Sequence, residues 1–177
     1  MADPIDVKVA KTTPRGASAV AVLSHSDQLN KVPGFKKAAL ERAGFSGERG
    51  TVVTFDDGDT ATVVVGLGPS SAAGTELRDA LRRGAAAFAR SVSRHKRVAF
   101  ELEGSTALAD ERCGVSLDAA ARAVTEGLVL GAYRFDDLRS ADKVKAGLGA
   151  VTLVVGDDND SVRAARAGVS AGAAVAA

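Results

Sequence analysis

Short apolar runs alternate with amphipathic segments along this 177-residue sequence, and that order predicts an α/β fold with a mixed β-sheet. Two observations lead to this prediction. Apolar runs of strand length are interleaved with stretches of helical periodicity, which is the pattern of strands connected by helices. The segment 51–65 instead holds two β-rich runs around an Asp-Gly pair, which indicates an antiparallel hairpin in the same sheet.

The N-terminal part of the chain is predicted to contain two strands and one helix. Residues 5–10 alternate apolar and polar side chains, as in a half-buried strand. Residues 17–23 form a nearly continuous apolar run, as in a central strand that is covered on both faces. The polar residues 24–27 are predicted to be a loop. We expect a short helix over 35–42, with Gly44 in the left-handed conformation that ends it.

The middle of the chain predicts a hairpin followed by a long helix. Strands at 51–55 and 60–65 flank a turn at 56–59, and residues 66–71 form a loop that leads into the helix. Apolar residues then recur at three- and four-residue spacing, with the arginines largely outside this stripe, as in an amphipathic surface helix. The stripe consists of Leu77, Leu81, Ala85, Phe88 and Val92.

The last part of the chain predicts two strands and two helices. Residues 97–102 alternate as a strand does, and Ser116 is well placed to cap the helix that follows. The buried stripe of that helix consists of Leu117, Ala121, Val124, Leu128 and Ala132. A strand at 151–155 precedes acidic residues at 157–160, which can cap a final helix.

The final helix is predicted to run to the last residue. Its apolar stripe consists of Val162, Ala165, Val169, Ala173 and Ala176. No capping glycine, closing lysine or arginine, or proline follows the last turn, although these residues usually mark a helix end. We therefore expect the sequence to stop inside a longer helix and to be a fragment of a longer protein.

The composition is that of an ordinary globular domain, with 46% hydrophobic and 25% charged residues. The formal net charge of +1 gives no electrostatic reason to expect nucleic acid or an anionic membrane as the main partner. No apolar run approaches the about 18 residues of a membrane span, and the first thirty residues contain no signal-peptide core. A single cysteine excludes an intrachain disulfide and favours a reducing, cytosolic setting.

The loop Gly66–Ser71 is a candidate binding site. Gly66-Leu67-Gly68 follows a predicted strand and precedes a helix, which is where α/β proteins can bind phosphate. The spacing does not complete G-x-G-x-x-G, because Ser71 occupies the last position, and no Gly-Lys-Ser/Thr follows. The favoured interpretation is a tight strand-to-helix turn, and a nucleotide or ADP-ribose loop is the alternative.

Two acidic groups contain residues of the types that bind cations. They consist of Asp56, Asp57 and Asp59, and of Asp157, Asp158 and Asp160. The first group lacks the twelve-residue loop and final glutamate of an EF-hand, so we interpret it as a solvated hairpin turn. The second group suits the capping of the last helix. With two histidines and one cysteine, the chain is also poorly equipped for a structural zinc site.

Two further groups contain residues of catalytic types. Ser24, His25 and Asp27 are the residues of a triad, but triads converge from distant segments, so we interpret these three as a polar loop. Cys113 follows Arg112, which favours the thiolate, yet no histidine is close in sequence and a structural thiol is the better interpretation.

The densest basic segment consists of Arg78, Arg82, Arg83, Arg90, Arg94, Lys96 and Arg97. Such a segment is either a face that contacts nucleic acid or the solvated side of an amphipathic helix. The near-neutral charge of the whole chain favours the solvated side.

Several of these segments together resemble the N-terminal domain of leucyl aminopeptidases, the cytosol aminopeptidase family. Residues 126–136, EGLVLGAYRFD, are similar to the family signature near the end of that domain. The strand end 64–68 is similar to its Val-Gly-Leu-Gly turn, and a helix with Leu-Arg-Asp-Ala at 77–80 follows it as in the family. The strand at 151–155 and the Ala-rich final helix complete a resemblance that covers nearly the whole chain.

The resemblance implies a macro-domain-like three-layer sandwich, with a mixed sheet flanked by helices on both faces. Full-length members of the family are cytosolic, hexameric aminopeptidases with two divalent metals, zinc or manganese, that release N-terminal amino acids such as leucine. Their metal ligands and catalytic groups lie in motifs such as GKGITFDSGG and NTDAEGR of a C-terminal domain. Neither motif occurs in this sequence, so the resemblance carries no catalytic, cofactor-binding or metal-ligating residue to this chain.

We therefore expect residues 1–158 to form the aminopeptidase N-terminal domain and residues 159–177 to begin the helix that connects it to a catalytic domain outside this sequence. The expected role is structural, with the catalytic domain and a homo-hexamer as partners and with neither nucleic acid nor membrane. Tyr133 and Phe135 are expected to anchor the loop after their helix by burial. Two alternatives remain: a macro-domain-like module that binds a nucleotide or ADP-ribose, and, more weakly, the DNA binding of some bacterial family members.

Overall fold

A computed structural model describes residues 5–102, 113–133 and 147–176 of the chain. Its strands are β1 (Asp6–Ala10), β2 (Ala19–Ser24), β3 (Val52–Asp57), β4 (Thr60–Gly66), β5 (Arg97–Glu101) and β6 (Ala150–Val154). Its helices are the 3-10 helix η1 (Leu29–Lys31), α1 (Lys37–Arg42), α2 (Gly74–Ser91), α3 (Leu117–Ala132) and α4 (Asn159–Ala176). Each strand and helix expected from the sequence is present, with slightly shifted boundaries.

The strands form one mixed sheet in the order β1-β6-β5-β2-β4-β3. Parallel pairing joins β1 to β6, β6 to β5, β5 to β2 and β2 to β4. Among the strands of the described ranges, β3 alone runs antiparallel, with Asp57 opposite Thr60 across the hairpin. Gly58 in the turn has φ +78°, a conformation that favours glycine. The predicted mixed sheet and its hairpin are therefore confirmed.

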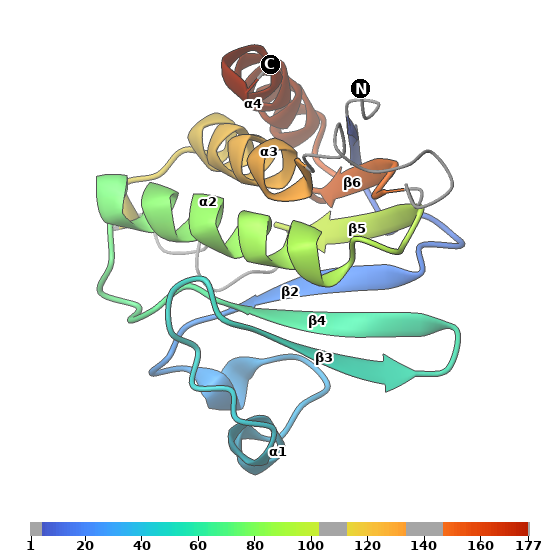
Figure 1. The fold of residues 1–177 in the computed structure, drawn as a ribbon. Helices are drawn as coiled ribbons and strands as arrows, with labels where there is room; N and C mark the ends of the chain where they lie inside the picture. Colours follow the sequence, from blue (N-terminus) through green and yellow to red (C-terminus); the bar gives the residue numbers. More distant parts are fainter. Residues whose placement is uncertain (1–4, 103–112, 134–146, 177) are drawn as a thin grey trace.

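Helices cover both faces of the sheet, as Figure 1 shows. Alternate residues of β4 point to opposite faces. Val63 and Val65 join the main core beneath α2, α3 and α4, whereas Val64 packs with Leu40 of α1 and Phe45. This arrangement confirms the expected three-layer sandwich.

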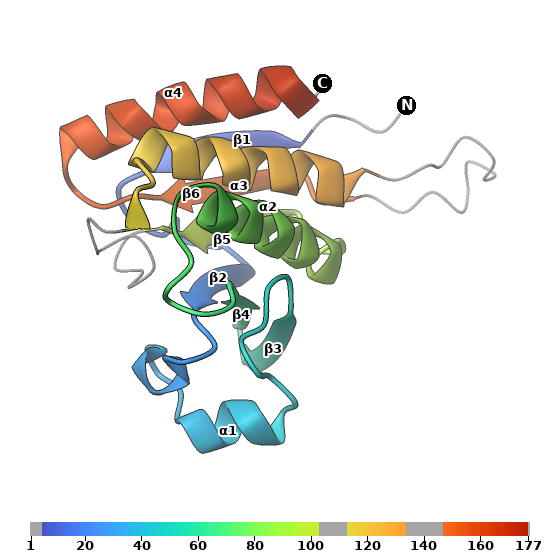
Figure 2. The same cartoon turned by 90° about the vertical axis from the view of Figure 1, so that its left-hand side faces the viewer.

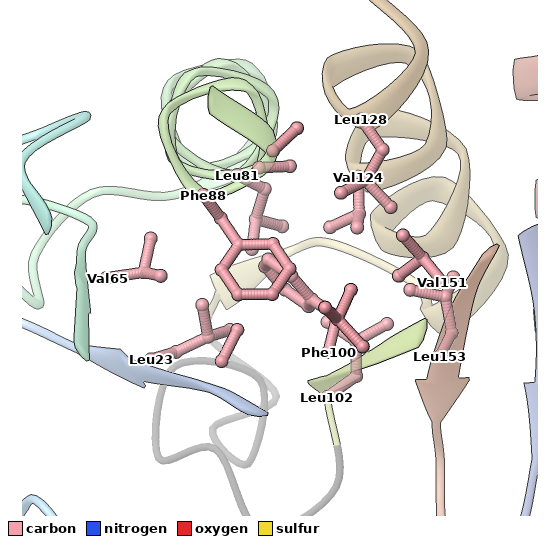
Figure 3. Packing of buried hydrophobic residues seen from close by; sticks show 14 of the residues in the cluster. Leu23, Val65, Leu81, Phe88, Phe100, Leu102, Val124, Leu128, Val151 and Leu153 are labelled. Atoms are coloured by element: carbon pink, nitrogen blue, oxygen red, sulfur yellow. The ribbon is translucent and has the colours of Figure 1, made fainter. Parts of the chain in front are cut away.

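The main core lies between the sheet and the helices above it, and Figure 3 shows its packing against α2 and α3. Every residue of the predicted α2 stripe is at most 2% exposed. The ring of Phe88 on α2 meets that of Phe100 on β5 edge-on, with centroids 5.4 Å apart and planes at 80°. Burying two such side chains stabilises the fold by about 1.5–3 kcal/mol each, and the edge-to-face geometry adds to that.

The helices α2 and α3 approach each other closely where α3 carries Gly127 and Gly131. A Cβ atom on Gly127 would lie 2.9 Å from the Cβ of Ala85 and would also meet the carbonyl oxygen of Arg82. A Cβ on Gly131 would lie 2.5 Å from the Cα of Ala86. The contacts advance in the same direction on both helices, so α2 and α3 run parallel, as Figure 2 shows.

The helices α3 and α4 meet in the same way. A Cβ on Gly168 would meet the carbonyl oxygen of Asp118, and one on Gly172 would lie 2.8 Å from the carbonyl oxygen of Arg122 and from the Cβ of Thr125. Glycine lowers helix propensity, but at these two positions it allows α4 to lie against the backbone of α3. The apolar stripe of α4 is only partly buried, because Ala165 is covered whereas Ala173 is exposed.

Helix ends differ in how well the sequence predicted them. Gly44 directly follows Ala43, the C-cap residue of α1, and has φ +77°, as expected. Asp158 caps α4, since its carboxylate accepts hydrogen bonds from the backbone nitrogens of Asp160 and Ser161 at 3.3 and 2.9 Å. Ser116 occupies the N-cap position of α3, but its side chain makes no capping hydrogen bond. Its hydroxyl instead bonds to the carboxyl group of Asp118 and so lowers the pKa of that carboxyl.

Replacing Gly127 by alanine should destabilise the fold even though alanine is the better helix former. The added methyl group must push α3 away from α2, and such overpacking costs about 1–3 kcal/mol in the free energy of unfolding. Gly147→Ala is the control, because a Cβ there would meet no atom within 4 Å. Urea unfolding of both variants measures the difference. Equal stability of the two variants would show that the α2–α3 packing is looser than described.

Candidate functional site

Parallel α/β sheets usually bind their ligands at the carboxyl ends of the strands. In this chain β2 and β4 are neighbours in the sheet and end together, with Ser24 opposite Gly66. The loops that follow these two strands contain the candidate residues 24–27 and 66–71. The structure therefore brings two of the sequence-predicted candidates together.

The polar residues after β2 hold the two loops against each other. His25 is 3% exposed, and its Nδ1 lies 3.1 Å from the carbonyl oxygen of Gly68, to which it donates a hydrogen bond. Asp27 accepts hydrogen bonds from the backbone nitrogen and the hydroxyl of Ser70, at 2.9 and 2.5 Å. The hydroxyl of Ser24 donates to the carbonyl oxygen of His25 rather than to its ring. These contacts form no triad, in agreement with the polar-loop interpretation.

The hydrogen bonds of Asp27 also affect its ionisation. The hydroxyl of Ser70 is the largest cause of a pKa below the ordinary value of 3.8, and partial burial opposes it. The backbone nitrogen of Ser70 adds to the lowering. Asp27 is therefore a carboxylate that ties the loop after β2 to the loop after β4.

The glycine loop uses its own backbone nitrogens within the chain. Those of Gly66, Leu67 and Gly68 donate to the carbonyl oxygens of Thr51, Ser24 and Gly47 at 2.8, 3.0 and 2.8 Å. Phosphate binding at such a loop needs backbone N–H groups that point at the ligand.

The segment 47–51 lies over this turn. A Cβ on Gly66 would lie 2.6 Å from the hydroxyl oxygen of Thr51 and 2.8 Å from the carbonyl carbon of Gly47. The glycine at position 66 is thus required by the close approach of its own chain, which supports the interpretation as a tight turn.

The acidic residues and the cysteine lie in different parts of the described chain. Asp56 and Asp59 lie exposed at the β3–β4 hairpin, and Asp158 is engaged in capping α4. Within residues 5–102, 113–133 and 147–176, no group of three or more histidines, cysteines or acidic residues is placed to hold a metal ion. The half-buried thiol of Cys113 lies 3.7 Å from the carbonyl oxygen of Val115.

A buried carboxylate joins α2 to α3, and the sequence did not single it out. The side chain of Glu126 is 8% exposed, and its Oε2 accepts hydrogen bonds from Nη2 and Nε of Arg82 at 2.7 and 2.8 Å. Its Oε1 accepts one from Nε of Arg122 at 2.9 Å. An acidic residue inside an otherwise apolar stretch, four residues after an arginine, is the sequence signal that could have indicated this group.

The two arginines decide the charge of Glu126. Burial by itself raises the pKa of this carboxyl, but the hydrogen bonds and charges of Arg122 and Arg82 outweigh it and hold the pKa below the ordinary 4.5. A buried carboxylate without such partners would be strongly destabilising. We call Glu126, Arg82 and Arg122 the Glu126 cluster.

The Glu126 cluster borders a surface depression of about 240 Å³ between α2 and α3. The depression is lined by Arg78, Arg82, Asp118, Ala119, Arg122, Ala123 and Glu126. A guanidinium nitrogen of Arg78 donates to the hydroxyl of Thr75 at 3.0 Å.

Much of the basic segment is paired or solvated. Asp79 lies 3.7 Å from Arg82 and 2.7 Å from Arg83, so two arginines of the basic segment belong to ion pairs on α2. The remaining side chains beyond α2's middle are exposed, namely Arg90, Arg94, Lys96 and Arg97. The four arginines of α2 fit the solvated side of an amphipathic helix, whereas Arg94, Lys96 and Arg97 follow that helix, with Arg97 at the start of β5.

The expectation that Tyr133 anchors the fold by burial is wrong. Tyr133 directly follows α3 and is 73% exposed. The neighbouring turns of α3 are held by Gly127, Gly131 and Glu126 instead, so the ring is not needed to fix the helix end. Phe135, the second expected anchor, lies outside the described residues.

A family model described as the cytosol aminopeptidase family, N-terminal domain, matches residues 20–142. A probable cytosol aminopeptidase of Streptomyces avermitilis is 35% identical over 173 residues, which are 90% of this chain and 31% of the relative. One of Streptomyces coelicolor is 37% identical over 157 residues, 84% of this chain and 27% of the relative. The chain thus spans about a third of the length of these curated relatives.

Two solved structures are similar in fold. The bottromycin maturation enzyme BotP superimposes with a TM-score of 0.65 at 31% identity, over 90% of this chain and 31% of that one. A tomato leucine aminopeptidase mutant superimposes with a TM-score of 0.64 at 21% identity, over 94% of this chain and 36% of that one. In addition, none of the helices in the described part of this chain is long and apolar enough to cross a membrane.

The substitution Glu126→Gln should lower the free energy of unfolding near pH 7 by about 1–2 kcal/mol, because it replaces charged hydrogen bonds to two arginines by neutral ones. The pKa of Glu126 is lower in the folded chain than its ordinary 4.5. The stabilisation is therefore present above that value and is lost as the pH falls through the folded pKa.

Denaturant unfolding of the unmodified chain and of Glu126→Gln should be measured from near pH 7 down to below the folded pKa of Glu126. The free energies of unfolding of the two proteins should converge in acid. The control is Glu41→Gln, which removes an exposed pair with Lys37 at 3.6 Å and should change stability by less than about 0.5 kcal/mol. A difference that persists unchanged in acid would contradict the assignment of the effect to the Glu126 carboxylate.

Calorimetric titration with ADP-ribose up to about 1 mM, a concentration that detects even weak binding, should give no binding heat. The backbone nitrogens of Gly66, Leu67 and Gly68 are already bonded, and a ligand would have to displace the segment 47–51. Measurable binding would show that this segment opens and that the glycine turn can receive a phosphate.

Proposed function

Because this chain belongs to the cytosol aminopeptidase family as its N-terminal domain, we propose that it is the non-catalytic N-terminal domain of a leucyl aminopeptidase. The family match over residues 20–142 carries this proposal. The coverage of about a third of each Streptomyces relative supports it, since the greater part of those proteins has no counterpart in this sequence. The domain's role is to pack against the catalytic domain and to help shape the assembly.

The contacts of the polar residues support a structural role. His25 and Asp27 bind the loop after β4, Glu126 binds α2 to α3, and Asp158 caps α4. Each of these groups holds two parts of the chain together. Such side chains serve the fold rather than a reaction.

The parent enzyme's chemistry is assigned to the part beyond this sequence. Two divalent metals, zinc or manganese, would supply the activation of water and of the scissile carbonyl there. The residues of this chain do not fit such a centre, because the family's metal-binding motifs do not occur in it. No catalytic step is therefore assigned to residues 1–177. A cytoplasmic hexamer is the expected setting of the whole enzyme.

An assay with leucyl-p-nitroanilide tests the proposal. The purified 177-residue chain should release no p-nitroaniline in the presence of manganese or zinc, whereas the complete product of its gene should release it under the same conditions. The chelated complete protein is the control for metal dependence. Hydrolysis by the 177 residues alone, or none by the complete product with metal, would contradict the proposed function.

A further inference from the structure

Exposed large hydrophobic side chains cluster at one end of the helical layer. In the described ranges three such side chains are exposed, Leu130 at 60%, Tyr133 at 73% and Val175 at 62%. The first two lie in the last turn of α3 and directly after it, and the third lies in the last turn of α4. Both helices run in the same direction, so these turns are at the same end of the layer (Figure 2).

The three side chains share one surface. Leu130 and Tyr133 are three residues apart and therefore lie on the same side of α3. Gly172 packs against the turn of α3 that contains Arg122 and Thr125. Because the two helices are parallel, Val175, almost one turn further along α4, lies beside the following turns of α3. We call Leu130, Tyr133 and Val175 the apolar patch.

The Glu126 cluster forms a polar border to the apolar patch. Glu126 precedes Leu130 by four residues, so its side chain lies on the same side of α3 as the exposed leucine and tyrosine. Arg122 precedes Glu126 by four residues on the same side, and its side chain is 50% exposed. An apolar centre that contains tyrosine, with arginine at its border, is the composition typical of protein–protein interfaces.

Contacts within the fold explain three other residues in this part of α3. Gly127 and Gly131 allow α2 to approach, and Glu126 binds Arg82 and Arg122. Leu130 and Tyr133, in contrast, are mostly exposed in the chain as described. Contiguous exposed hydrophobic residues of this kind mark a surface that a partner covers.

We infer that the apolar patch is the surface on which the remainder of the same aminopeptidase polypeptide docks. This inference rests on the proposed function. The Streptomyces relatives extend well beyond the matched part, which is 31% and 27% of their lengths. In such a protein the chain continues from α4, the helix that carries Val175, so the following domain is held next to the patch. Covalent linkage gives it a high effective concentration at that surface, which favours it over a separate partner.

Oxidative footprinting of Tyr133 tests the inference directly, because Tyr133 is the single tyrosine of these 177 residues. Hydroxyl radicals should oxidise it rapidly in the 177-residue chain. In the complete gene product the rate should fall about tenfold, as expected for a residue in the dry centre of an interface. Phe55, which is half-buried on the opposite face of the sheet, should react equally in both proteins and serves as the internal control.

A charge placed in the apolar patch supplies the second measurement. In the complete protein, Leu130→Glu should restore much of the Tyr133 oxidation rate seen in the 177-residue chain. Ala38→Glu introduces the same charge at an exposed position of α1, on the other face of the sheet, and should leave the rate unchanged. In the 177-residue chain, Leu130→Glu should leave the melting temperature nearly unchanged, since Leu130 is exposed there.

Four outcomes would overturn the inference. Equal Tyr133 oxidation in an active complete enzyme and in the 177-residue chain would show that the patch stays uncovered, while the proposed function stands. A large fall in the melting temperature of the 177-residue Leu130→Glu variant would show that the chain itself covers the patch. Protection that rises with the concentration of the 177-residue chain would assign the patch to a second copy. An inactive complete product would remove both the proposed function and this inference.

Discussion

Close approach of three parallel helices is the constraint on which the rest of this structure depends. Glycines at the contact points let α3 lie against α2 and let α4 lie against the backbone of α3, as at Gly131 and Gly172. Any side chain there would separate the helices by more than the core could fill, because protein interiors have few voids. The packing of α2 and α3 over the sheet, with Phe88 against Phe100, requires this spacing.

The same approach explains why a carboxylate is buried in the family-like segment of α3. It brings Arg82 of α2 within hydrogen-bonding distance of Glu126, and the helical repeat places Arg122 on its other side. Two arginines keep the carboxylate charged despite burial. Burying a carboxylate costs solvation free energy, which its charged hydrogen-bond partners offset. The contact with Arg82 joins α3 to α2 one turn before Leu130.

The two ends of the fold differ in how their polar and apolar side chains are engaged. At the carboxyl end of β2 and β4, where α/β proteins commonly bind ligands, His25, Asp27 and the segment 47–51 close the loops on each other. At the far end of the helical layer, Leu130 and Tyr133 remain exposed. Where a small ligand would bind, the polar groups of the loops are hydrogen-bonded to each other. At the other end, the hydrophobic side chains of Leu130 and Tyr133 are exposed, as on a surface to which another protein binds. This division agrees with a domain that assembles rather than reacts.

The sequence by itself determined the elements, the mixed sheet and the buried stripe of α2, because these follow from periodicity and turn residues within a few positions of each other. It also indicated the tight turn at Gly66 and the cap at Asp158. Only the tertiary structure decided that Glu126 is buried and that Tyr133 is exposed. A helical repeat states on which side of its own helix a residue lies, but not which neighbouring element covers that side, and burial depends on that neighbour.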